Sequence, residues 1–187
     1  MAQFVVVAIT LIGIYYQFRL QRAASTFEQI NRLQEEWGGP QQTRAKLAAA
    51  RAIHQGQLAP LAPASVIGNF CEAVASLIRH GHVNTRAVYE TMGPSIIVWW
   101  VLLEDTVKAL REREHDPTGN IHFEWLARAF LALASKDQVD AGAYGRSVVM
   151  SALPEYIRAW EERITIVEGS DARSSPAVRR RKNASVR

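Results

Sequence analysis

The sequence has a single cysteine, Cys71, among 187 residues, and only 7 prolines and 11 glycines. One thiol excludes an intrachain disulfide and any zinc site built on several cysteines, which agrees with a reducing compartment. Cys71 lies between Phe70 and Val74 on an expected helix, so we expect a buried and unreactive thiol. With 48% hydrophobic residues, the composition indicates a globular chain with a sizeable core, and the length predicts one domain.

Catalytic and metal-binding motifs are also missing. The chain has no GxSxG, no HExxH and no glycine-rich phosphate loop. His80 and His82 flank a glycine that is expected to end a helix, so they lack the i, i+4 spacing by which two imidazoles share a metal from one helical face. His115 and His122 add no such spacing. The sequence therefore predicts neither an enzyme nor a protein that holds a metal or cofactor.

A net positive charge is absent from the body of the chain, although the isoelectric point of the whole chain is about 9.5. Residues 169–187 carry a net charge of +5, which leaves −1 for residues 1–168 and no basic face that would indicate nucleic-acid binding. This terminal stretch is rich in Ser and Arg, contains one proline and is predicted to be a disordered tail. Its run Arg179, Arg180, Arg181 and Lys182 would be attracted to anionic lipid headgroups by about 1 kcal/mol per cation, whereas a plain solvated tail is the alternative. RNA is disfavoured as a partner because no aromatic residue accompanies the cations.

A strongly apolar run lies at the start of the chain, where residues 2–18 carry no formal charge. As a helix they would span about 25 Å, slightly less than the hydrocarbon core of a bilayer. Apolar residues cover every face of this run. A signal peptide would have basic residues before its apolar segment, and none precedes this run. We expect a single transmembrane helix over residues 1–19; a buried helix of a soluble protein and a cleaved signal peptide are the alternatives. Because Arg19 and Arg22 follow the run, the positive-inside bias predicts an outer N-terminus and a cytoplasmic domain.

Residues 20–39 are predicted to be a juxtamembrane helix that ends at the Gly-Gly-Pro of residues 38–40. Its apolar residues form two short heptad registers, Leu20 with Phe27 and, in the other, Ala23, Ile30 and Trp37. A parallel homodimer could form along this seam, but packing against the protein's own domain is the preferred interpretation.

The helical domain is predicted to cover residues 40–168. Pro40 suits the first turn of a helix that ends near Gly56, and Ser65 is expected to cap a helix that ends at Gly81. Asn84 is expected to cap a short helix over residues 85–93. Further helices are predicted from Pro94 to about Glu114, over residues 121–135 and over residues 153–167. No convincing strand pattern is present, so the fold class is all-α, a bundle of about five or six helices.

A polar row occurs on the predicted helix that begins at Ser65 and ends at Gly81. Asn69, Glu72, Ser76 and Arg79 are spaced i, i+3, i+7 and i+10, which puts them along one face. We interpret the row as a structural network, in which Glu72 and Arg79 bind helix termini or charges on neighbouring helices. The functional alternative is a strip that binds a small anionic ligand through Arg79. The tryptophans at positions 99, 100, 125 and 160 are expected to be core anchors, of which an exposed one could mark a groove for a partner.

Several short segments resemble a known family. A single N-terminal span that runs into a helix, followed by "NFCEAVASLIRHG", "VYETMGPSIIVWW" and "FEWLARAF", is similar to bacterial membrane-anchored helical proteins grouped as domain of unknown function 4760. The likeness covers residues 1 to about 133. It implies a bacterial, single-span, mostly helical protein and carries over no catalytic residue. The Arg-rich tail departs from the family pattern, as does Cys71, where an aromatic residue is expected.

Taken together, these features predict a single-pass protein of the bacterial inner membrane. Its cytoplasmic helical domain would be a scaffold or protein-interaction module whose partner the sequence does not identify. The alternative is a soluble or peripheral helical protein that binds a small anion.

Overall fold

The computed structural model describes residues 14, 17 and 27–174, and the described residues form only helices and connecting turns. Residues 27–38 are helical, and α2 (Pro40–His54), α3 (Leu61–Arg79), α4 (Thr85–Glu114) and α5 (Ile121–Lys136) follow. The short 3-10 helix η1 (Ala141–Tyr144) leads into α6 (Arg146–Ser174). The all-α prediction is thereby confirmed for the described residues. The predicted transmembrane helix of residues 1–19 lies almost entirely outside them, and so does the basic tail from residue 175 onward.

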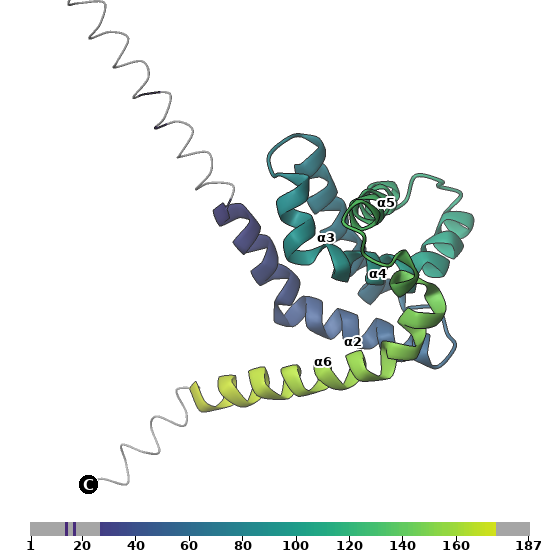
Figure 1. Cartoon of the computed structure of the whole chain (residues 1–187). Helices are drawn as coiled ribbons and strands as arrows, with labels where there is room; N and C mark the ends of the chain where they lie inside the picture. The colour runs from purple at the N-terminus through teal and green to yellow at the C-terminus, as the bar shows by residue number, and fades with distance from the viewer. Residues whose placement is uncertain (1–13, 15–16, 18–26, 175–187) are drawn as a thin grey trace, which may run out of the picture.

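The helices enclose one apolar core. α2 lies between α6 on one side and α3 on the other, while α5 packs against both α3 and α4 (Figure 1). α4 also contacts α6 and η1. The largest fully buried side chains come from α3, α4, α5 and α6, and include Ile67, Trp99, Phe123, Phe130 and Leu153. This burial in a common core, rather than the propensity of any one segment, holds the helices in place.

The helix of residues 27–38 packs on the domain instead of standing apart from it. Ile30, Leu33 and Trp37 are all buried in the shared core, so the preferred interpretation of this helix is confirmed for the register that contains Ile30 and Trp37. Phe27, from the other register, is 67% exposed. A homodimer along this helix stays a prediction, and in the described residues only the register of Phe27 still has an exposed apolar side chain.

Two helix starts differ from the sequence-based expectation. α3 begins at Leu61, after Pro60, so Ser65 lies inside the helix and is not its cap. The helix includes Pro63 because a proline is tolerated within the first turn, where the N–H groups have no intrahelical partner. α6 begins at Arg146, well before the predicted residue 153, and contains Pro154; it then continues to Ser174, beyond the predicted start of the tail.

α4 is a single helix of 30 residues where two were predicted. Asn84 caps it as expected, with its side-chain oxygen accepting from the backbone N–H groups of Arg86 and Ala87 at 2.8 and 3.1 Å. Pro94 lies inside this helix and removes one backbone hydrogen bond, at a typical cost of about 3 kcal/mol. The helix continues because its apolar face does: Met92 and Ile96, on either side of Pro94, are both buried.

One described helix, α3, is long and apolar enough to cross a membrane by length and composition, with 39% of its most apolar window buried in the protein. The same properties are found in core helices of soluble proteins. α3 packs here against α2, α4 and α5, and its Ile67, Cys71 and Val74 are fully buried. We therefore describe α3 as a core helix.

Candidate functional site

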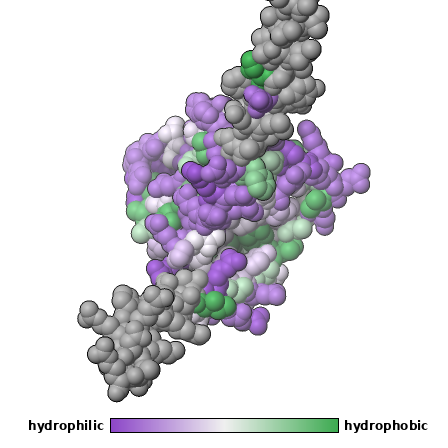
Figure 2. Space-filling view, turned by 90° about the vertical axis from the view of Figure 1, so that its left-hand side faces the viewer, coloured by the Kyte–Doolittle hydropathy of each residue, from purple (hydrophilic) through white to green (hydrophobic). Residues whose placement is uncertain are grey.

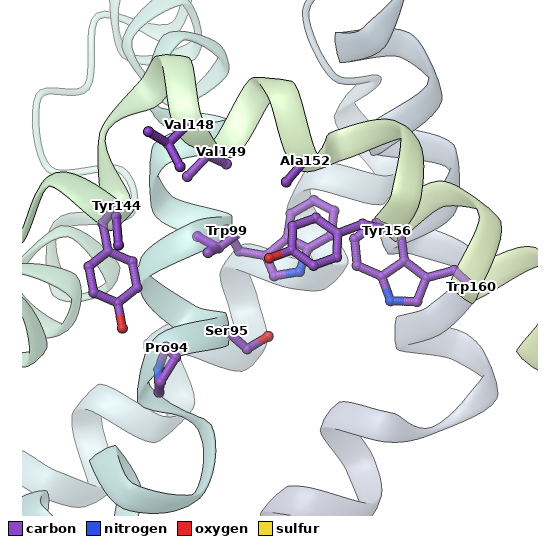
Figure 3. A pocket seen from close by; sticks show the side chains of 11 residues that line it. Pro94, Ser95, Trp99, Tyr144, Val148, Val149, Ala152, Tyr156 and Trp160 are labelled. Atoms are coloured by element: carbon purple, nitrogen blue, oxygen red, sulfur yellow. The ribbon is translucent and has the colours of Figure 1, made fainter. Parts of the chain in front are cut away.

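An apolar groove lies between the first half of α4, η1 and the first half of α6. Its volume is about 380 Å³. The residues that line it are Pro94, Ser95, Val98, Trp99, Ala143, Tyr144, Val148, Val149, Ala152, Tyr156 and Trp160 (Figure 3). We call this feature the aromatic groove, because four of these side chains carry aromatic rings. Figure 2 shows one face of the domain, largely hydrophilic, on which hydrophobic side chains gather in a recess across the middle.

Three aromatic rings in contact with one another form one side of the aromatic groove. Trp99 is 1% exposed, and its ring packs against that of Trp160 with centroids 5.3 Å apart. Trp160 in turn stacks on Tyr156 at 5.8 Å. Val148 and Tyr156, at the outer edge, are 47% and 38% exposed. They are eight residues apart on α6, so the groove extends about 12 Å along this helix.

No charged side chain lines the aromatic groove. Its polar side chains are the hydroxyls of Ser95, Tyr144 and Tyr156. The pKa of Tyr144 lies above its ordinary value, mainly because partial burial disfavours the phenolate, so this hydroxyl stays neutral at physiological pH. A buried charge without a partner is costly, and the groove therefore suits uncharged, apolar groups.

Polar contacts at the start of α6 fix the wall that this helix provides. Arg146 pairs with Asp105 on α4 at 2.6 Å and donates to the carbonyl oxygen of Val101 at 3.3 Å. Asp140 caps η1 by accepting from the N–H of Gly142 at 2.8 Å. The two helices that line the groove, α4 and α6, are thus tied together next to it.

Trp37 connects the helix of residues 27–38 to the aromatic groove. Its indole Nε1 donates to Ser95 Oγ, a groove residue, at 3.1 Å, and its ring stacks on Phe70 at 4.8 Å. Lys46 Nζ lies 3.3 Å from the centre of the same ring and donates to the backbone oxygen of Trp37 at 2.6 Å. The helix of residues 27–38 is therefore held at a fixed position beside the groove.

Lys46 is only 5% exposed, and among the described residues no carboxylate forms an ion pair with it. Burial lowers its pKa from 10.5 to about 7, the nearby Cys71 opposes this shift, and the positive charge of Arg163 adds to it. Cys71 is fully buried, as predicted, and its pKa is raised far above the ordinary value, mainly by that burial. Its thiol is therefore protonated and a poor nucleophile.

The predicted polar row faces the start of α5. Glu72 Oε1 accepts from the backbone N–H of Phe123 at 2.8 Å, in the first turn of α5. The residue at the N-cap position, Asn120, makes no side-chain capping bond, so Glu72 supplies the cap from another helix. Arg79 donates to Nδ1 of His122 at 2.6 Å. Asn69 and Ser76 lie exposed on the same face.

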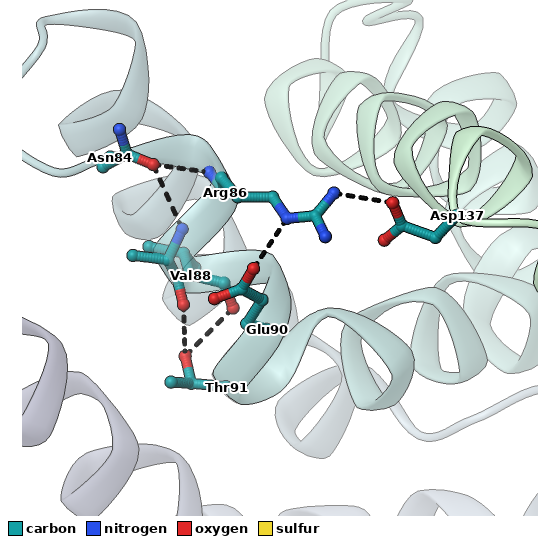
Figure 4. Close-up of polar contacts among 7 residues, drawn as sticks. Asn84, Arg86, Val88, Glu90, Thr91 and Asp137 are labelled. Carbon is teal, nitrogen blue, oxygen red and sulfur yellow. Dashed lines mark hydrogen bonds and ion pairs between the residues drawn. The ribbon is translucent and has the colours of Figure 1, made fainter.

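The opposite end of α5 is tied to α4 by Arg86. Its Nε pairs with Glu90 at 2.7 Å, and its Nη1 pairs at 2.8 Å with Asp137, the C-cap residue of α5 (Figure 4). These bonds raise the pKa of Arg86, first through Asp137 and then through Glu90. Both ends of α5 are thus held by side chains from other helices.

The histidines do not form a metal site. The rings of His80 and His82 are 6.2 Å apart and tilted. In the described part of the chain, no group of three or more His, Cys, Asp or Glu side chains is arranged to hold a metal ion. His80 instead lines a small surface hollow with Ser76, Arg79 and His122. The predicted lipid-binding residues, Arg179, Arg180, Arg181 and Lys182, lie outside the described residues.

The aromatic groove was not predicted from the sequence as a site. Trp99 and Trp160 were expected to be core anchors, and Trp125, which is exposed, lies outside the groove. The signal that could have found it is the i, i+4, i+8 spacing of Val148, Ala152 and Tyr156, an apolar stripe on a helix whose start was predicted too late.

Comparison with known proteins places the chain in a family. No curated protein and no solved structure matches it. The model of one family, described as a domain of unknown function, matches residues 1–130, which include all of α2, α3 and α4 but not the α6 wall of the groove. The chain therefore belongs to the DUF4760 family.

Proposed function

We propose that this chain is a single-span protein of the bacterial inner membrane whose helical domain binds a protein partner on the cytoplasmic side. The observation that carries the interaction role is the aromatic groove, an open apolar surface without a charged side chain. The occupant that fits it is the apolar face of an amphipathic helix, because such a face presents hydrophobic side chains every three to four residues over the length of the groove.

The membrane anchor is supported by the uncharged residues 2–18 and by the arginines that follow them. The helix of residues 27–38 follows this segment and would extend about 18 Å. Because Trp37 fixes its end beside Ser95, an anchor at the N-terminus would hold the aromatic groove close to the membrane surface. The basic residues 179–182 would add attraction to anionic lipid headgroups.

Photo-crosslinking in intact membranes tests the groove directly. A photoreactive phenylalanine at Val148, on the edge of the groove, is expected to give a discrete adduct with the apolar face of an amphipathic helix of another protein. The matched control is the same probe at Ser151, which is exposed on α6 but does not line the groove. Ala152→Glu, which brings a carboxylate into the groove, should remove the adduct.

Mass spectrometry of the crosslinked peptide decides between the outcomes. Equal adducts from positions 148 and 151, or an adduct that persists in Ala152→Glu, would contradict the groove as the binding surface. A crosslink to a second copy of this chain would show that the groove binds another copy of the same protein, and not a different partner.

A further inference from the structure

A second surface feature, separate from the aromatic groove, lies where the end of α3 meets the start of α5. It is a hollow of about 290 Å³ lined by Ser76, Arg79, His80 and His122. We call it the basic hollow, because three of its four side chains are basic and none is acidic. Its fourth side chain, Ser76, offers a hydroxyl donor.

Arg79 differs from most described arginines in the partner it has. Arg51, Arg86, Arg111 and Arg146, for example, each pair with a carboxylate on another part of the chain. Arg79 forms no such pair within the described residues; its one hydrogen bond goes to the imidazole Nδ1 of His122, at 2.6 Å. A guanidinium has five N–H donors, so most of those of Arg79 are left for another acceptor.

The side chains around Arg79 hold its guanidinium at the hollow. Its central carbon lies 5.8 Å from the ring centre of Trp125, and its Nη1 is bound to His122, so two side chains of α5 contact it. The acidic residue of the polar row, Glu72, does not line the hollow, and one of its oxygens is bound to the N–H of Phe123. The first turn of α5, which contains His122, adds the partial positive charge of a helix N-terminus.

We propose that the basic hollow binds a phosphate group, which inorganic phosphate or the phosphomonoester headgroup of phosphatidic acid would supply. Arg79 binds two phosphate oxygens through its planar guanidinium, and Ser76 donates its hydroxyl to another. His80 and His122 donate ring N–H groups. The site does not depend on the aromatic groove, from which it differs in both residues and helices.

The test is a titration of the full chain, held in neutral maltoside micelles and labelled with ¹⁵N in its histidines. Inorganic phosphate should shift the imidazole signals of His80 and His122 in a saturable manner, because both rings line the hollow. Arg79→Gln should weaken binding at least tenfold, because it removes the charge-assisted hydrogen bonds. The matched control is Arg113→Gln, which removes an exposed arginine that pairs with Glu114 outside the hollow.

A second variant keeps the test valid if Arg79→Gln fails to fold. Ser76→Ala removes an exposed hydroxyl and should weaken phosphate binding about threefold while the melting temperature stays unchanged. The lipid arm replaces free phosphate with micelles that contain phosphatidic acid, with phosphatidylcholine as the control. Shifts with phosphatidic acid alone assign the site to a lipid headgroup, and shifts with free phosphate alone assign it to a soluble ligand. No shift with either, or equal affinity in Arg79→Gln, would overturn the proposal.

Discussion

The buried Lys46 should give the folded protein a distinctive dependence on pH. Burial lowers its pKa from 10.5 to about 7 in the folded state, while in the unfolded chain it keeps the ordinary value. Below pH 7 the amine is protonated in both states, and the folded state carries the whole cost of burying the charge, about 5 kcal/mol. Between pH 7 and 10.5 the unfolded chain binds one proton more than the folded chain. The free energy of unfolding should therefore rise with pH in this window.

From pH 7 to pH 9 the expected rise is about 2 kcal/mol. Cys71 acts in the opposite direction, because its raised pKa keeps the folded thiol protonated while the unfolded thiol ionises; this lowers stability by less than about 1 kcal/mol at pH 9. Cys71→Ala removes this second effect and makes the contribution of Lys46 easier to measure.

The decisive variant is Lys46→Met, which replaces the amine by an apolar side chain of similar length. It removes the cost of the buried charge, although the backbone oxygen of Trp37 loses its hydrogen bond, at about 1 to 3 kcal/mol. Lys46→Met should therefore be about 2 to 4 kcal/mol more stable than the native chain at pH 6 and nearly equal to it at pH 9. Urea unfolding followed by tryptophan fluorescence between pH 6 and 9 measures this. A native chain whose stability does not change over this range, or a variant with the same slope, would refute the reasoning.

Three further predictions concern contacts between helices, each measured by urea unfolding. Glu72→Ala should lower the free energy of unfolding by about 1 to 2 kcal/mol, because the first turn of α5 loses its cap. The control Asn69→Ala, on the same face of α3, should change it by less than about 0.5 kcal/mol. Equal effects of the two variants would contradict the capping role of Glu72. A double-mutant cycle of Trp37→Phe and Ser95→Ala should give a coupling of about 1 kcal/mol for the indole hydrogen bond, and strict additivity would show that the bond contributes nothing. Gly68→Ala should change the free energy of unfolding by less than about 1 kcal/mol, since its Cβ would meet only the end of the Asn120 side chain, which makes no capping bond and can rotate away; a larger loss would mean that Asn120 is held in place.

Local chemistry explains which parts of the fold could be predicted. Pro40 and Asn84 begin α2 and α4 as expected, because both act on backbone groups within one turn. The join between the two predicted halves of α4 could not be predicted in the same way. Pro94 argues locally for a helix start, and only the burial of Met92 and Ile96 in a common core favours one continuous helix.

In the candidate sites, too, features set by local spacing could be predicted, whereas contacts between distant parts of the chain could not. The polar row on α3 was predicted with its spacing, and the structure shows what Glu72 and Arg79 contact. Their partners, Phe123 and His122, lie more than forty residues away and could not be identified by spacing alone. The aromatic groove combines α4 with η1 and α6, and η1 is too short to have a recognisable period. Lys46 carries no sequence signal of burial, since it lies on an amphipathic helix among other basic residues.

The most direct test of the proposed function is alkaline-carbonate extraction of membranes, comparing the full chain with a chain that lacks residues 2–18. The proposal predicts that the full chain stays in the membrane pellet and that the shortened chain is released into the supernatant. Release of both would contradict the membrane anchor, and with it the proposal that the aromatic groove is held at a membrane surface.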